Sequence, residues 1–419
     1  MKKTIYIIFI IVLLALIGGG IYYWFFYSKI PITTVDGTTP DKNSGFSPFT
    51  GQNIINQNDR NSTTTQQVPD TDISSTNGEY KLPKLRQLST TPIAGYIASS
   101  TASSSIARFV DRGTGHIYEA SNISPNIVKI SNTTLPKIYE AYGNKNGTNF
   151  ILRYLKNDTD IISNFYAELR KIGTSSNDIP YELKGKFLSP DVNQIAVSPN
   201  GDKVFTWNIE SGNGVGYISA FDEKTKVKTV DIPLSQVSID WPEASSLIVS
   251  TKASAVSSSF IYSIDPKTGI SKTILGGLRG LTGKLSLNNS KLIYSVRDND
   301  SLITSILNLK DGSSEEVIFR TLSEKCVWGN IKKEELFCAV PTEIPNALYP
   351  DDWYKGKVSF IDQIWHLNTT TGEVHLLANL IKISSKAIDA IDLKLDPKEE
   401  TLYFINKQDL TLWALDLNQ

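Results

Sequence analysis

Metal-binding side chains are scarce in this sequence of 419 residues, which contains three His, two Cys and one Met. Zinc sites are typically built from four Cys or His ligands or from an H-E-x-x-H helix, and neither pattern occurs. The acidic stretches 298–300 and 351–352 do not have the spacing of a calcium loop. We therefore expect no metal ion and no cofactor.

Clustered positive charge is also missing. The chain has 42 Lys and Arg against 43 Asp and Glu, a formal net charge of −1. Nucleic acid binding requires basic residues gathered on one face, because the phosphates must be neutralised. We expect no nucleic acid partner. No Gly-x-Ser-x-Gly motif occurs either, which argues against an α/β-hydrolase domain.

One long apolar run is present, from Ile5 to Tyr27, and it contains 23 uncharged residues preceded by Lys2 and Lys3. As a helix this run is about 34 Å long, enough to cross a hydrocarbon core of about 30 Å. We expect residues 1–4 in the cytoplasm, residues 5–27 to span the cytoplasmic membrane once, and the rest of the chain on the outside, in the periplasm or at the cell surface. The alternative is a signal peptide cleaved near Gly18–Gly20.

Residues 28–79 have a different composition. Between positions 31 and 78, 33 of 48 residues are Ser, Thr, Asn, Gln, Gly or Pro. Such a segment buries too little apolar surface to offset the entropy lost on ordering. The sequence predicts a disordered linker that separates the membrane span from a folded domain.

Residues 80–419 consist of short apolar runs separated by turn residues. Runs of four to eight residues with turns between them indicate an all-β domain. Short strands also recur at spacings of 42, 53, 49, 43, 44 and 58 residues, near the positions Leu88, Ile130, Leu183, Ile232, Leu275, Phe319 and Leu377. A four-stranded propeller blade needs roughly 40–50 residues. The sequence predicts a β-propeller of about seven blades, with a two-sheet sandwich as the alternative.

The last repeat supplies three strands before the chain ends, and an isolated strand near Leu85–Leu88 precedes the first repeat. We expect this strand to complete the last blade. Closing the ring in this way leaves no long exposed sheet edge.

Several segments carry a family resemblance. The turns Ser198–Gly201 and Asp396–Lys398 resemble those of WD-repeat-like and TolB-like bacterial propellers, and segments 112–118, 130–134 and 349–354 are similar to membrane-anchored bacterial propellers. The resemblance covers roughly residues 85–419 and implies a propeller fold. It implies little about activity, because propellers have many functions.

The two cysteines lie on the two strands of a predicted hairpin. Cys326 and Cys338 flank a polar turn and would face each other across the pair of strands. Outside the cytoplasm we expect them to form a disulfide. Two buried free thiols are the alternative.

Two segments are candidate binding sites. The longest repeat has extra residues between Pro341 and Phe360, and these include Tyr349, Asp351, Asp352, Trp353 and Tyr354. Aromatic and acidic side chains on a proline-rich loop are typical of a binding surface, since Tyr and Trp dominate contact energetics. The alternative is that the aromatic rings pack inward.

The second candidate is the segment 112–116, where Arg112 and His116 offer contacts for an anion or a sugar. A hairpin turn explains the same residues. The chain as a whole is expected to be a binding or scaffolding module for an envelope protein or a cell-wall polymer. The alternative is an enzyme that cleaves glycans from the central channel by hydrolysis or elimination, with paired carboxylates.

Overall fold

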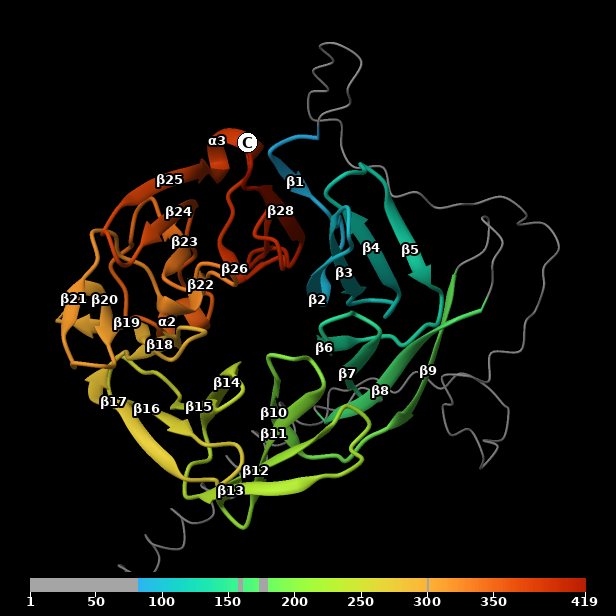
Figure 1. Cartoon of the computed structure of the whole chain (residues 1–419), viewed down its shortest axis with the longest axis horizontal. Coiled ribbons are helices and arrows are strands. Elements are labelled where there is room, and N and C mark those ends of the chain that lie inside the picture. The colour runs from blue at the N-terminus through green and yellow to red at the C-terminus, as the bar shows by residue number, and fades with distance from the viewer. Residues whose placement is uncertain (1–81, 157–160, 173–179, 300) are drawn as a thin grey trace, which may run out of the picture. The chain divides into compact units, whose positions relative to one another are not determined.

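The computed structural model describes residues 82–156, 161–172, 180–299 and 301–419. The membrane span and the whole of the linker expected from the sequence lie outside these residues. Within the described ranges, no helix is both long and apolar enough to span a bilayer. The described part is a β-propeller, in which sheets follow one another around a ring (Figure 1).

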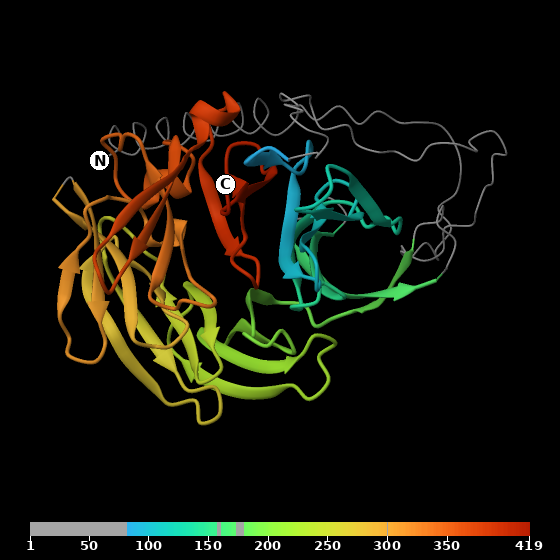
Figure 2. The ribbon, with the colours of Figure 1, turned by 45° about the horizontal axis from the view of Figure 1, so that its top comes forward.

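The first half of the ring is made of three groups of four antiparallel strands, and Figure 2 shows them from a second direction. Their bounds are β2 Ile93–Ser100, β3 Ser105–Asp111, β4 Ile117–Ser121 and β5 Ile127–Ser131; β6 Ile138–Gly143, β7 Asn149–Leu155, β8 Ile162–Lys171 and β9 Tyr181–Phe187; and β10 Val192–Val197, β11 Lys203–Glu210, β12 Asn213–Ala220 and β13 Val227–Ile232.

Three further groups follow. Their bounds are β14 Val237–Glu243, β15 Ser246–Thr251, β16 Ser258–Ile264 and β17 Ser271–Arg279; β18 Thr282–Leu285, β19 Lys291–Asp298, β20 Ser301–Asn308 and β21 Ser314–Glu316; and β22 Cys326–Trp328, β23 Glu335–Pro341, β24 Asp362–Asn368 and β25 Val374–Asn379. Three short helical segments accompany the last of these groups, namely η1 Ser323–Lys325, α2 Asp351–Tyr354 and α3 Leu380–Ser384.

The last sheet contains β26 Ala390–Leu395, β27 Thr401–Asn406, β28 Leu412–Asp416 and, from the other end of the domain, β1 Leu85–Gln87. Strand β1 pairs antiparallel with β28, and Leu85 lies opposite Leu415. The N-terminal strand thus completes the last sheet, as the sequence predicts.

The number of separate sheets differs from the seven blades expected. Five sheets have four strands each, and the remaining strands form one sheet of eight. The eight-stranded sheet contains the groups β2–β5 and β6–β9, which are joined by a single parallel pairing of Ser131 with Tyr181. The outer strands β5 and β9 touch there, so two repeats of the sequence merge into one sheet.

The position of a strand within its group decides how much of it is buried. The second strands are covered on both faces, and all six residues of β27 are buried. The fourth strands lie at the outer edge of the ring, and all three residues of β21 are exposed. Strands buried on both faces have continuous hydrophobic runs rather than alternation, which explains the apolar runs in the sequence.

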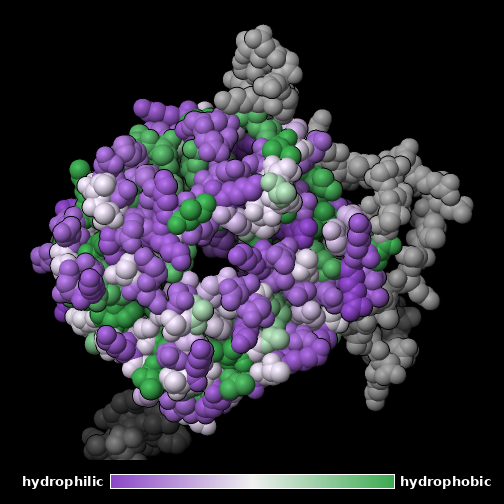
Figure 3. Space-filling model, in the orientation of Figure 1, coloured by the Kyte–Doolittle hydropathy of each residue, from purple (hydrophilic) through white to green (hydrophobic). Residues whose placement is uncertain are grey.

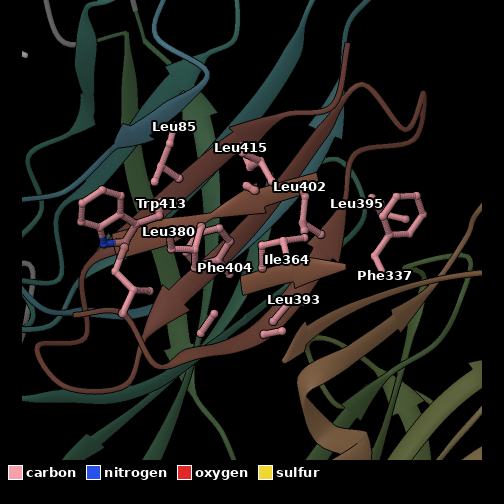
Figure 4. Packing of buried hydrophobic residues seen from close by; sticks show 14 residues of the cluster. Leu85, Phe337, Ile364, Leu380, Leu393, Leu395, Leu402, Phe404, Trp413 and Leu415 are labelled. Atoms are coloured by element: carbon pink, nitrogen blue, oxygen red, sulfur yellow. The ribbon is translucent and has the colours of Figure 1, made fainter. Parts of the chain in front are cut away.

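The hydrophobic core is divided among the contacts between neighbouring sheets. The cluster in Figure 4 joins the last sheet to the one before it through side chains of β1, β26, β27 and β28 on one side and β23 and β24 on the other. Another cluster joins the last sheet to the first group through Tyr403, Leu412, Ile93 and Phe109. Apolar packing therefore continues across the point where the two ends of the domain meet.

Candidate functional site

An open cavity of about 400 Å³ lies at the centre of the ring. Figure 1 shows the first strand of each group nearest to the ring centre, and Figure 3 shows a hollow there surrounded by hydrophilic side chains. The lining comes from the start of β10, the start of β14, the end of β15, η1 and α2. Its residues are Asn193, Gln194, Ser235, Gln236, Val237, Ser238, Lys252, Ala253, Glu324 and Tyr354.

Glu324 and Tyr354 form a hydrogen-bonded pair on one side of this cavity. The Tyr354 hydroxyl donates to both carboxylate oxygens of Glu324 at 2.8 Å. Burial raises the pKa of Glu324, whereas the Tyr354 hydrogen bond and the positive charges of Lys284 and Lys325 lower it. Burial and the neighbouring carboxylate raise the pKa of Tyr354. The pair therefore offers an acidic group and part of an aromatic ring to a ligand in the cavity.

The extra segment between β23 and β24 places Tyr354 at the cavity but turns its other aromatic residues inward. Tyr349 is 2% exposed and Trp353 is 5% exposed. Both rings stack on Phe360, with ring centroids 5.7 Å and 6.1 Å from it. The interpretation of these two rings as a contact surface is therefore wrong, because apolar packing in the interior removes them from solvent.

The two aspartates of this segment hold it in place. Asp351 accepts hydrogen bonds from the backbone N–H of Ala255 at 2.6 Å and from the Ser254 hydroxyl at 3.3 Å, so it ties α2 to the connection after β15. Asp352 accepts the Leu348 N–H at 3.0 Å and lies 2.9 Å from the Lys357 ammonium. Of the five residues proposed from the sequence in this segment, only Tyr354 lines the cavity.

A buried ionic cluster lies beside the cavity. The Lys325 ammonium is 2.8 Å from Asp362 Oδ2 and 2.5 Å from Asp389 Oδ1, and all three side chains have no exposed surface. Asp389 Oδ2 also accepts a hydrogen bond from Trp353 Nε1 at 2.9 Å. Lys325 adjoins Glu324 in the chain, so the cluster supports the wall that carries the Glu324–Tyr354 pair.

Arg112 lies in, and His116 directly follows, a hairpin turn that occurs five times among the residues that the structure describes. In each turn the N–H of the fifth residue donates to the carbonyl of the first at 2.8–2.9 Å, and the fifth residue has a positive φ of 57–76°. The turns are 111–115, 265–269, 308–312, 368–372 and 406–410. Gly occupies the fifth position in four of them, because it adopts this conformation without strain.

The side chains of this first turn have partners within the protein. The Arg112 guanidinium lies 5.4 Å from the centre of the Tyr139 ring. His116 Nε2 is 3.1 Å from the Thr134 hydroxyl, and burial lowers the pKa of His116. The turn explains this segment, and neither residue lines the central cavity.

The sequence did not indicate Glu324, Lys325, Asp362 or Asp389. Asp362 begins β24, Asp389 directly precedes β26 and Glu324 lies in η1, and no local sequence pattern distinguishes these acids from those of surface turns. Within the residues that the structure describes, no group of three or more His, Cys, Asp and Glu side chains is arranged to hold a metal ion.

Comparisons with known proteins support the fold. No protein-family model matches the chain, and no curated protein matches it. An oligogalacturonate lyase from Vibrio parahaemolyticus has a similar structure, with 9% sequence identity, a TM-score of 0.51 and coverage of 79% of this chain and 93% of the lyase. TolB from Acinetobacter baumannii is similar at 11% identity and a TM-score of 0.39, over 80% of this chain and 66% of TolB. The chain is thus a β-propeller whose fold is similar to that of the oligogalacturonate lyase.

Proposed function

We propose that this chain is a binding module displayed outside the cytoplasmic membrane, anchored through residues 5–27, and that its central cavity takes a segment of a polar cell-wall polymer. The observation that carries this proposal is the composition of the cavity wall. Six of its ten lining residues carry an amide or a hydroxyl group, and the wall holds one cation, Lys252, and one acid, Glu324.

This chemistry suits an uncharged polar chain such as a glycan. Asn193, Gln194 and Gln236 offer both donors and acceptors, which sugar hydroxyls require. Tyr354 is 37% exposed and adds an aromatic ring with a hydroxyl held by Glu324. Binding sites commonly place a few polar groups in a concave wall on a rigid scaffold, and the ring provides such a scaffold. An envelope protein that inserts a polar loop is the other partner class, and the test below distinguishes it.

The test is a titration of the chain with soluble cell-wall glycan fragments by calorimetry. We expect binding by the wild-type chain and a loss of about fivefold in affinity for Gln236→Ala and for Tyr354→Ala, since each ordinary hydrogen bond or contact contributes about 1 kcal/mol. Thermal unfolding of each variant is measured alongside. Undiminished affinity in both variants contradicts the proposed site, and binding only to envelope proteins moves the proposal to a protein partner.

A matched control is available on the outer part of the ring. In β12 the Tyr217 hydroxyl donates to both carboxylate oxygens of Glu210, at 2.8 Å and 3.1 Å, which repeats the Tyr354–Glu324 arrangement away from the cavity. Tyr217→Ala is expected to leave glycan affinity unchanged. Equal losses in Tyr217→Ala and Tyr354→Ala would show that the effect is not local to the cavity.

The alternative activity is cleavage of a glycan in the same cavity. The glycan fragments incubated with the chain are analysed for cleavage products. New reducing ends or unsaturated sugars after incubation with the wild-type chain, and their loss in Glu324→Gln, would assign an enzyme. The anchor is tested separately by protease treatment of spheroplasts. We expect the protease to digest the ring from outside the cytoplasmic membrane, and protection of the ring contradicts the topology.

We also infer that the ring repeats seven times. Each half of the eight-stranded sheet has the strand number of one of the five separate sheets, which supports this count. The spacings of the sequence repeat support it independently.

A further inference from the structure

Lys325 occupies an unusual position for a cation. Its ammonium nitrogen lies 2.5 Å from Asp389 Oδ1, 2.8 Å from Asp362 Oδ2 and 3.0 Å from the carbonyl oxygen of Ala390. Lys325, Asp362 and Asp389 each have no exposed surface. A lysine is rarely fully buried, and here two carboxylates face one ammonium in an interior site.

The surroundings of this cluster are apolar and aromatic. The Lys325 nitrogen lies 5.4 Å from the centre of the Trp353 ring and 5.2 Å from that of Phe360. Burying ions in such a site carries a large desolvation penalty, which mutual attraction offsets only in part. A reaction that turns the ion pair into a neutral group would remove this penalty.

The two carboxylates are held in different ways. Asp389 Oδ2 accepts three hydrogen bonds, from Trp353 Nε1 at 2.9 Å, the backbone N–H of Phe360 at 3.0 Å and the Ser359 hydroxyl at 3.1 Å. Three donors aimed at one oxygen are suited to stabilising an oxyanion. The other oxygen of Asp389 is the one that touches Lys325.

Asp362 is arranged to exchange a proton. Its Oδ2 accepts from Lys325 and from the N–H of Ala390, whereas its Oδ1 is buried with no hydrogen-bond partner among the described residues. A buried carboxylate oxygen without a partner favours the uptake of a proton by the ionised group. Consistent with this, burial first and the charge of Asp389 next raise the pKa of Asp362 to about 6, against the opposing charge of Lys325.

We propose that Lys325 and Asp389 join in an intramolecular amide bond that the folded protein forms by itself, with Asp362 as the proton carrier. The product is an isopeptide cross-link between the start of β22 and the start of β26. These two residues are 64 positions apart in the chain and belong to neighbouring sheets. The link lies next to Cys326, which is bonded to Cys338.

The reaction balances without any co-reactant. Asp362 takes one proton from the Lys325 ammonium and passes it to Asp389 Oδ1, so that a neutral amine faces a neutral carboxylic acid. The amine attacks Asp389 Cγ to form the new C–N bond, and the negative charge of the tetrahedral intermediate develops on Oδ2, where Trp353, Ser359 and Phe360 donate. A second proton passes from the nitrogen to Oδ1, which leaves as water when the C–O bond breaks and the carbonyl of the amide re-forms at Oδ2.

Proximity explains how an unactivated carboxyl group can react. Groups fixed in contact within one molecule can behave as if present at about 10⁵ M or more, provided that the geometry is held. Here Lys325 and Asp389 are held by packing on Trp353 and Phe360 and by the donors to Oδ2. The released water is diluted into bulk solvent, which opposes the reverse reaction.

The test is the intact mass of the full chain after denaturation and reduction. We expect a mass one water below the sequence value and, after proteolysis, one branched peptide that contains Lys325 and Asp389. A full unreacted mass overturns the proposal, and so does a water loss that maps to an Asp-Gly site such as Asp311–Gly312. This measurement on the wild-type chain decides the matter even where a variant does not fold.

Variants then assign the roles. Asp362→Asn keeps the shape of the side chain but cannot carry the proton, so we expect its mass to equal its sequence value while its circular dichroism stays native. Lys394→Ala removes a lysine whose ammonium is 2.9 Å from Asp392 at the surface, and we expect the water loss to persist there. A complete cross-link in Asp362→Asn would overturn the role given to Asp362.

Discussion

Trp353 Nε1 donates a 2.9 Å hydrogen bond to Asp389 Oδ2, and this bond ties the longest repeat of the sequence to the first strand of the next sheet. Both side chains are buried, and the same Asp389 faces Lys325. The extra residues of this repeat therefore fill the space between two sheets around an ionic cluster. Only the adjoining Tyr354 reaches the central cavity.

Replacing Trp353 should destabilise the propeller. Trp353→Ala removes a buried ring that packs on Phe360 and leaves a cavity, so we expect a loss of roughly 3–5 kcal/mol in the free energy of unfolding. Urea denaturation measures this loss when it is followed by far-ultraviolet circular dichroism, because this signal comes from the backbone and does not depend on Trp353. Trp353→Phe keeps most of the packing and removes one donor to Asp389, so about 1–3 kcal/mol is expected. A loss below 1 kcal/mol in Trp353→Ala would contradict the packing role.

Asp362 should make stability depend on pH. Its pKa of about 6 in the folded state lies above the value near 4 of an unfolded chain, so the folded protein binds this proton more tightly. The resulting stabilisation is fully present below about pH 4 and is lost as the pH rises through about 6, a total of roughly 3 kcal/mol. The charge of Lys325 lowers the pKa of Asp362, and the charge of Asp389 raises it. An amide bond between Lys325 and Asp389 removes both charges, so the two effects on this pKa disappear together.

The measurement is the difference in unfolding free energy between the wild-type chain and Asp362→Asn, taken at several pH values from about 4 to 7. Subtraction removes the contribution of other carboxylates. As the pH rises, the unfolding free energy of the wild-type chain should fall relative to that of Asp362→Asn. A constant difference, or one of opposite slope, contradicts the raised pKa.

Removing β1 should open the ring. Residues 80–89 include Leu85 and Leu88, which are 6% and 2% exposed and pack against the last sheet and the first group. Deleting these ten residues leaves the last sheet without its fourth strand, and we expect a lower midpoint of thermal unfolding, because truncating even one buried Leu typically costs about 2–5 kcal/mol. An equal deletion in the predicted linker, residues 60–69, is the control and should leave the midpoint unchanged. Equal midpoints in both deletions would show that β1 contributes nothing to closure.

The cysteine pair should be oxidised in protein taken from the cell envelope. Cys326 and Cys338 face each other across β22 and β23, their sulfurs are bonded, and both residues are fully buried. Cross-linking a loop of this length contributes roughly 3 kcal/mol in the chain-entropy model. We expect no free thiol in the denatured, unreduced protein and a lower unfolding free energy in the Cys326→Ala and Cys338→Ala double variant. Two titratable thiols would argue against export.

Much of the fold followed from local sequence patterns. The spacing of short strands and turns predicted a propeller, and the isolated strand near Leu85 predicted how the last sheet is completed. These features depend on residues close together in the chain or on simple counting. The merging of two repeats into one sheet depends on a contact between Ser131 and Tyr181, which no spacing reveals.

The candidate site was predictable only in part. The excess length of one repeat directed attention to the segment that contains Tyr354, and the cavity wall does include this residue. The sequence could not show that Trp353 is buried whereas Tyr354 faces the cavity. Adjacent residues of a short helix point in different directions, and either aromatic ring suits a surface or an interior.

The sequence by itself determined the all-β class, the order of the strands and the turns that connect them, because periodicity, Gly and Asx residues act over a few positions. Only the tertiary structure decided that Lys325, Asp362 and Asp389 meet in one buried cluster and that Glu324 and Tyr354 share a cavity wall. The contacting residues are up to 64 positions apart, as Lys325 and Asp389 are, and lie on different strands and loops. These residues meet because the ring brings the starts of neighbouring sheets together. No local sequence pattern shows which distant residues will be in contact.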